Sequence, residues 1–131
     1  MGKETACIDT DICIDFLRNR EPGKGMFLRA IAEFIPHITS ITAFELHLGH
    51  IKMKKRENLE DFINQFHMLS FDSKAAKITA KIQAELDEKG TGIGMPDTLI
   101  AGICIANTIP LLTNNINHFS RIKSLNLIEL H

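Results

Sequence analysis

Short apolar runs alternate with amphipathic helical patterns along the whole chain, and this alternation restricts the fold more than any other feature. The apolar runs are too short for helices and predict strands at residues 6–9, 36–41, 67–71, 110–113 and 125–130. Helices are predicted between them at 11–20, 24–34, 42–57, 58–66, 73–89 and 96–107, with a helical turn at 116–122. Strands joined by helices run parallel, so we expect an α/β sandwich with a mainly parallel central sheet flanked by helices.

Single residues mark where several of these helices begin. Thr10 is expected to cap the helix at 11–20, and Asp72 and Ser73 can cap the long helix at 73–89. Pro96 stands at the start of an apolar helix, directly after the irregular, glycine-rich stretch 90–96. These signals place the helix starts close to the ends of the predicted strands.

Length and charge limit the kinds of protein that the chain can be. Its 131 residues fit a single domain, residues 1–131, and contain no internal repeat. The formal net charge of −1 excludes a protein that attracts nucleic acid by its overall charge. Binding to an RNA or DNA backbone therefore needs a metal ion or a local basic patch. Residues 52–57, KMKKRE, are a candidate patch, although a solvated helix end is the simpler explanation.

The cysteines and the hydropathy pattern indicate the compartment. Cys7, Cys13 and Cys104 lie in apolar contexts without CxxC spacing, which predicts reduced thiols in the core. No apolar run approaches the roughly 18 residues of a membrane span, and no signal-peptide pattern is visible. We expect a cytoplasmic protein that does not engage a membrane.

Three acidic residues and one amide fall at strand ends or helix starts. Asp9 ends the first predicted strand, Glu45 lies in the first turn of the helix at 42–57, and Asp97 lies in the first turn of the apolar helix. Asn115 follows the predicted strand at 110–113 by two residues. In parallel sheets the ligand crevice lies beyond the carboxyl ends of the strands, so these four side chains are expected at one edge.

Carboxylates gathered at one edge repel each other unless protons or a divalent cation neutralise them. Hard oxygen ligands of this kind suit Mg²⁺ or Mn²⁺, and an ion held this way can activate water and stabilise charge on a phosphodiester. Each residue also has a simpler explanation. Acids at helix starts are favourable partners of the helix dipole, and asparagine is a common turn residue.

Four stretches together resemble the PIN-domain family and, within it, the VapC-like toxins of toxin–antitoxin pairs. They are IDTDICIDFL, SITAFELHLG, MPDTLIAGICIAN and LLTNNINHFSRI, and they occur in the family's order over about residues 6 to 130. The resemblance implies a PIN-like three-layer sandwich and a metal-dependent endoribonuclease. It also implies a cognate VapB-like antitoxin that blocks the site, a homodimer formed through helices, and structured RNA such as tRNA as the substrate class.

The same resemblance assigns the site residues. Asp9, Glu45 and Asp97 match the family's three acidic positions and would hold Mg²⁺ or Mn²⁺, and Asn115 matches a fourth position that carries aspartate or asparagine. With an amide at position 115 the site has one charge fewer, which leaves the binding of a second metal open. Thr113 would supply a supporting hydroxyl near the carboxylates.

Several neighbouring residues keep two explanations. Asp11 either hydrogen-bonds to a metal ligand or only interacts with the helix dipole, and Asp15 is expected to be a surface acid. His118 either touches substrate or packs locally, and His47 with His50 lacks the further ligands of a zinc site.

Two other functions are compatible with the same pattern. One is a PIN-like module that binds RNA or a regulatory partner without cleaving it, for which the amide at 115 is the only support. The other is a metal-dependent phosphatase-type hydrolase on another α/β fold.

Overall fold

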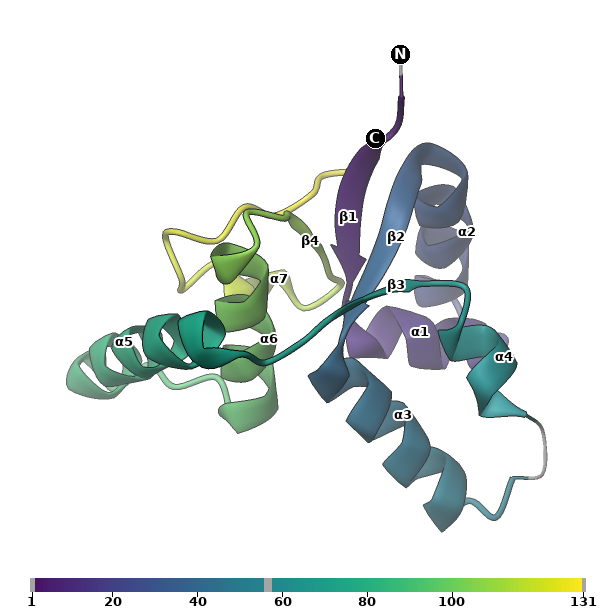
Figure 1. Cartoon of the computed structure of the whole chain (residues 1–131), viewed down its shortest axis with the longest axis horizontal. Coiled ribbons are helices and arrows are strands. Elements are labelled where there is room, and N and C mark those ends of the chain that lie inside the picture. The colour runs from purple at the N-terminus through teal and green to yellow at the C-terminus, as the bar shows by residue number, and fades with distance from the viewer. Residues whose placement is uncertain (1, 56–57, 131) are drawn as a thin grey trace.

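The computed structural model describes residues 2–55 and 58–130, and it places a parallel sheet between two groups of helices (Figure 1). The sheet has four strands in the order β3-β2-β1-β4, and every neighbouring pair is parallel. They are β1 (Glu4–Ile8), β2 (Phe34–Thr39), β3 (His67–Leu69) and β4 (Leu111–Leu112). The predicted α/β sandwich with a parallel central sheet is confirmed.

Helices connect the strands and cover both faces of the sheet. They are α1 (Thr10–Leu17), α2 (Gly23–Glu33), α3 (Ser40–Lys52), α4 (Leu59–Ile63), α5 (Ser73–Lys89), α6 (Met95–Ala106) and α7 (Ile116–Phe119). In β1, Ile8 packs into a core with residues of α1, α2 and α4, whereas Cys7 packs into a second core with α5 and α6. Because side chains alternate along β1, this one strand contributes residues to two separate cores.

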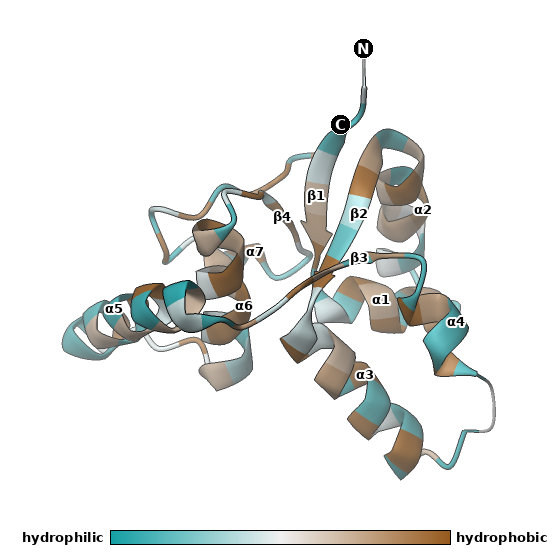
Figure 2. Ribbon diagram, viewed as in Figure 1, coloured by the Kyte–Doolittle hydropathy of each residue, from teal (hydrophilic) through white to brown (hydrophobic). Residues whose placement is uncertain are grey.

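Helix α6 is buried along most of its length, as the apolar sequence after its first turn predicts. Figure 2 shows the hydropathy of its residues. It packs closely on α5 at Gly102, where an added Cβ would collide with the hydroxyl of Thr79. Asp72 caps α5 by accepting a hydrogen bond from the Ala75 N–H, and Pro96 stands in the first turn of α6, both as predicted. This packing fixes the direction in which the first turn of α6 points.

Three expectations from the sequence are wrong in detail. The strand predicted at 125–130 is reduced to one parallel bridge between Leu127 and Leu111, because β4 is only two residues long and offers little ladder to extend. Thr10 does not cap α1, because the side chain of Asp9 accepts the hydrogen bond from the Thr10 N–H. The helix predicted at 42–57 ends at Lys52, and positions 56 and 57 lie outside the described residues.

The topology brings three strand ends together. Strand β1 lies between β2 and β4, and Figure 1 shows β1 and β2 leading directly into α1 and α3. The segments that leave the carboxyl ends of these strands therefore share one edge of the sheet. None of the helices in the described ranges is both long and apolar enough to span a membrane.

Candidate active site

Asp9 lies at the carboxyl edge of the sheet, between the end of β1 and the start of α1, and forms the buried floor of the candidate site. Its side chain is 2% exposed. Oδ1 accepts a hydrogen bond from the Thr10 N–H at 2.8 Å, and Oδ2 accepts one from the Thr113 hydroxyl at 2.7 Å. Both oxygens are thus fixed by neighbours from opposite ends of the sequence, and each keeps a lone pair for another partner.

Glu45 is joined to the same floor through a chain of threonine hydroxyls. Thr10 Oγ1 donates to Glu45 Oε1 at 2.8 Å and lies 2.8 Å from the hydroxyl of Thr42. A hydroxyl has one proton to donate, so Thr42 donates to Thr10 and itself accepts from Thr39 at 3.3 Å. The donors therefore point from Thr39 toward the carboxylate of Glu45.

Thr39 and Thr42 are neighbours of the candidate site that the sequence analysis missed. Thr39 and Thr42 are fully buried, and Thr39 also caps α3 by accepting from the Thr42 N–H at 3.1 Å. The only sequence signal was the presence of hydroxyl residues in an otherwise apolar run before Glu45. Their pairing with Thr10 spans 32 residues and depends on β1 and β2 being neighbours.

Thr113 lies where the resemblance implies a supporting hydroxyl. It is 2% exposed, donates to Asp9 and accepts from the Asn115 N–H at 2.9 Å. One side chain thus ties the carboxylate after β1 to the turn after β4. Asn115 is positioned by this bond and precedes the short helix α7.

Asp97 and Asn115 meet at the ring of His118. His118 Nδ1 lies 3.2 Å from Asp97 Oδ2 and 2.9 Å from Asn115 Nδ2. A protonated Nδ1 donates to Asp97, whereas a bare Nδ1 accepts from the Asn115 amide, so the two hydrogen bonds exclude each other. The His118 and Asp97 side chains are 39% and 25% exposed, so this part of the site is open to solvent.

Burial and neighbouring negative charges disfavour the ionisation of Asp9, Glu45 and Asp11. Burial raises the pKa of Asp9 to about 7, the charges of Asp97 and Asp11 add to this, and the hydrogen bond from Thr113 opposes it. Burial also raises the pKa of Glu45, and so do the charges of Asp97 and Asp11. Asp11 is exposed on the surface but still partly desolvated, and this partial desolvation, followed by the charge of Asp97, raises its pKa. We call Asp9, Asp11, Glu45 and Asp97 the acidic cluster.

The acidic cluster fits a hard divalent cation by its chemistry. Its donors are carboxylate oxygens supported by hydroxyls, and a cation would relieve the repulsion among them. No three His, Cys, Asp or Glu side chains of the described segments already converge as a metal-binding group. The acids thus interact electrostatically at one edge of the sheet, but three of them do not yet converge as metal ligands.

Other polar residues singled out in the sequence lie in different surroundings. Asp15 is half-buried and accepts from the Gly23 N–H at 3.2 Å, so the expectation of a surface acid is wrong. His47 lies 3.2 Å from Glu60 across α3 and α4. In the candidate basic patch, Lys52, Lys54 and Lys55 are exposed, whereas position 56 lies outside the described residues.

Comparison with known proteins bears on what this edge does. The model of the PIN domain matches residues 6–125. The chain is 35% identical to ribonuclease VapC2 of Rickettsia felis over 125 residues, with 90% of this chain and 92% of the relative covered. It is 34% identical to the tRNA(fMet)-specific endonuclease VapC of Salmonella typhimurium, with 92% and 93% covered.

A solved structure agrees with both matches. The crystal structure of VapBC2 from Rickettsia felis, bound to a DNA fragment from its promoter, superposes with a TM-score of 0.83 at 30% identity, and the match covers 97% of this chain and 99% of the other. The chain therefore belongs to the PIN-domain family and, within it, to the VapC ribonuclease toxins of toxin–antitoxin pairs.

Proposed function

We propose that this protein is a metal-dependent endoribonuclease whose reaction takes place at the acidic cluster. The observation that carries the proposal is that Asp97 lies within electrostatic range of both Asp9 and Glu45 at the carboxyl edge of the sheet, where its charge adds to burial in raising the pKa of each. Carboxylates whose charges disfavour the ionisation of a neighbouring acid are poorly placed in an empty site and well placed around a cation.

Asp9, Glu45 and Asp97 would hold Mg²⁺ or Mn²⁺, directly or through water. Oxygen ligands of this type favour these ions over Zn²⁺. When bound, such an ion supplies positive charge that activates water and stabilises the charge developing on a phosphodiester. Asn115 is neutral and completes the site by coordination or by orienting a water molecule.

The chain's own groups prepare this site in two ways. Thr113 and the Thr10 N–H fix both oxygens of Asp9, and the threonine chain orients Glu45. His118 holds the carboxylate of Asp97 on the solvent side when its Nδ1 carries a proton. RNA would approach from that side, with its scissile phosphate over the buried floor. No serine, cysteine or histidine nucleophile is required.

Structured RNA of the tRNA class is the substrate that the relatives indicate. Two of them, from Salmonella typhimurium and Shigella flexneri, bear the name tRNA(fMet)-specific endonuclease, at 34% and 31% identity. From these two relatives we transfer to this chain only the substrate class, tRNA. The chain is also proposed to act as a homodimer, as expected from the family resemblance.

A VapB-like antitoxin is the proposed inhibitor, because several similar structures are VapBC complexes. An apolar groove of about 190 Å³ between α1, α3 and α4 reaches the site at Glu45. Leu17, Leu46, Met53 and Phe62 are among its lining residues. An apolar antitoxin segment in this groove would end beside the acidic cluster and could cover it.

RNA cleavage tests the proposal directly. Purified protein is incubated with total tRNA in Mg²⁺, Mn²⁺ or EDTA, beside Asp97→Asn and the matched control Asp72→Asn. Both acids stand at helix starts, but Asp72 only caps α5. We expect metal-dependent cleavage by the wild type and the control, and a loss of at least about 10³-fold in Asp97→Asn.

Other outcomes point elsewhere. Equal cleavage by all three proteins would indicate a contaminant or a different site. Metal binding without cleavage of any RNA would favour the non-cleaving module, for which the neutral Asn115 is the supporting observation. Hydrolysis of a small phosphate ester but not of RNA would favour the phosphatase-type hydrolase.

A further inference from the structure

Two histidines lie side by side on neighbouring strands, away from the acidic cluster. His37 of β2 and His67 of β3 are register partners in a parallel pair, so their side chains leave the same face of the sheet. Cys7, the partner of His37 on β1, is buried under α5 and α6, which identifies this face. At β2 and β3 these helices leave the face partly open: His37 is half-buried and His67 is exposed.

The distance between the rings suits a shared metal ion. Their centroids are 4.9 Å apart and their planes are inclined by 30°. Metal–nitrogen bonds of about 2.0–2.1 Å place the centroids of two imidazoles on one ion about 4.5–5.2 Å apart, for bond angles between square and tetrahedral. The separation seen here falls within that range before any metal is added.

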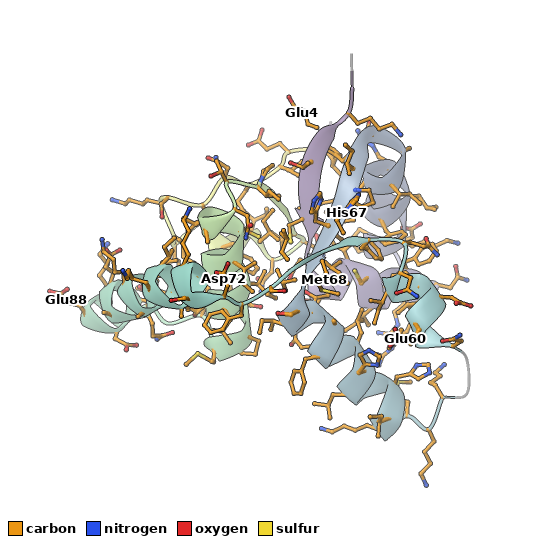
Figure 3. The ribbon with its side chains drawn as sticks, viewed as in Figure 1. Glu4, Glu60, His67, Met68, Asp72 and Glu88 are labelled. Atoms are coloured by element: carbon orange, nitrogen blue, oxygen red, sulfur yellow. The ribbon has the colours of Figure 1, made fainter. Side chains whose placement is uncertain are left out.

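A backbone hydrogen bond prepares His37 for such a role. Its Nδ1 lies 3.0 Å from the carbonyl oxygen of Ile35, and a carbonyl can only accept, so Nδ1 carries the proton. In the neutral ring Nε2 then keeps its lone pair. Histidines that bind metals commonly donate their second ring N–H to a carbonyl in this way. Figure 3 shows His67 in front of the sheet, with no helix drawn across it.

We propose that His37 and His67 form a two-histidine site for a divalent transition-metal ion, with water at the remaining positions. Imidazole nitrogen suits Cu²⁺, Ni²⁺ and Zn²⁺, whereas Mg²⁺ prefers oxygen, so this site and the acidic cluster select different ions. Since the described residues offer no third His, Cys, Asp or Glu ligand, binding is exchangeable and strongest for Cu²⁺. The ion joins the edge strand β3 to β2 and stabilises the folded chain.

Calorimetric titration tests the site independently of any nuclease activity. Protein without a histidine tag is titrated with Cu²⁺ and Zn²⁺ in saturating Mg²⁺, beside His37→Gln, His67→Gln, the double variant and the control His47→Gln. We expect one Cu²⁺ per chain. Each single variant should weaken binding at least about 10-fold, and the double variant should lose little more, because one imidazole alone binds poorly. The control should bind as the wild type does.

Two further readouts separate binding from misfolding. Bound Cu²⁺ should show an electron paramagnetic resonance spectrum of two equivalent nitrogens. Excess Cu²⁺ should raise Tm by about 5 °C in the wild type and in the His47→Gln control, but not in the His37 and His67 variants. The metal-free variants should melt within about 2 °C of the wild type. Unchanged Cu²⁺ affinity in His67→Gln, or the same loss in His47→Gln, would overturn the proposal.

Discussion

The acidic site has a buried half and an open half, and the two are held in different ways. In the buried half, Asp9 and Glu45 receive hydrogen bonds from Thr113, Thr10 and the Thr10 backbone. In the open half, Asp97 and Asn115 share a single nitrogen of His118, a residue of the four-residue helix α7. Folding alone therefore completes the buried half, whereas the open half is held by few contacts.

Because of this difference, substitutions in the two halves should affect stability and activity differently. Partners of the buried half are themselves buried, so removing one leaves a polar group without water or a replacement partner. Partners of the open half can exchange protein contacts for solvent. Substitutions in the buried half should change both folding and cleavage, and those in the open half should change cleavage alone.

Asp9→Asn is expected to have the largest effect, and its two consequences have opposite signs. Cleavage should fall at least about 10³-fold, because the proposed metal ligand at the floor of the site loses its charge. The metal-free protein should become more stable at pH 8, by about 1–4 kcal/mol, because the variant no longer buries a carboxylate. Cleavage assays and urea denaturation in EDTA measure the two effects.

The pH dependence provides the control. Burial raises the pKa of Asp9 from 3.8 to about 7 in the folded chain. Folding then takes up a proton between these values, so the contribution of Asp9 to wild-type stability is present at low pH and is lost as pH rises through about 7. The variant's advantage should shrink by more than half between pH 8 and pH 5 and disappear only below about pH 4. A variant that is less stable than the wild type at pH 8 would show that the hydrogen bonds outweigh the burial of charge.

Thr113→Val ranks second and should affect both properties. It removes the donor to Asp9 Oδ2 and the acceptor of the Asn115 N–H while preserving shape. Stability should fall by about 1–3 kcal/mol, and cleavage by about 10–100-fold. Thr113→Ser keeps the hydroxyl and should restore most of both. Equal losses in the serine variant would point to the methyl group and its packing.

The sequence predicted the parts of the site that depend on local order. An acid after an apolar strand, or in the first turn of a helix, is visible without the fold, so Asp9, Glu45 and Asp97 could be proposed together. Parallel strands then implied a common edge, and the structure brings these residues within electrostatic range. Metal binding by them stays a prediction.

The missed parts depend on contacts between distant segments. Thr10 meets Thr42 only because β1 and β2 are neighbours, and His118 meets Asp97 across 21 residues through α7. The wrong strand at 125–130 has the same origin. Its apolar pattern was correct, but pairing requires a partner, and β4 offers only two residues.

His118→Gln tests the open half alone. The ring that contacts Asp97 and Asn115 is lost, so the two side chains gain freedom, and cleavage should fall by about 10-fold. Tm should stay within about 2 °C, since the ring is 39% exposed. Thermal melting beside a cleavage assay measures both. A Tm loss as large as that of Thr113→Val would remove the distinction between the halves.

Asp11→Asn should have the smallest effect, and it decides what the fourth acid does. Asp11 is exposed, and its charge raises the pKa of Asp9 and of Glu45. If Asp11 acts only through its charge, the variant lowers the local negative charge. The Mg²⁺ concentration for half-maximal cleavage should then rise by about 2–5-fold, and the rate at saturating Mg²⁺ should not change. High salt should shrink the difference, because ions screen exposed charges over roughly 10 Å at 0.1 M. A lower rate at saturating Mg²⁺, insensitive to salt, would instead place Asp11 in contact with a ligand or with the substrate.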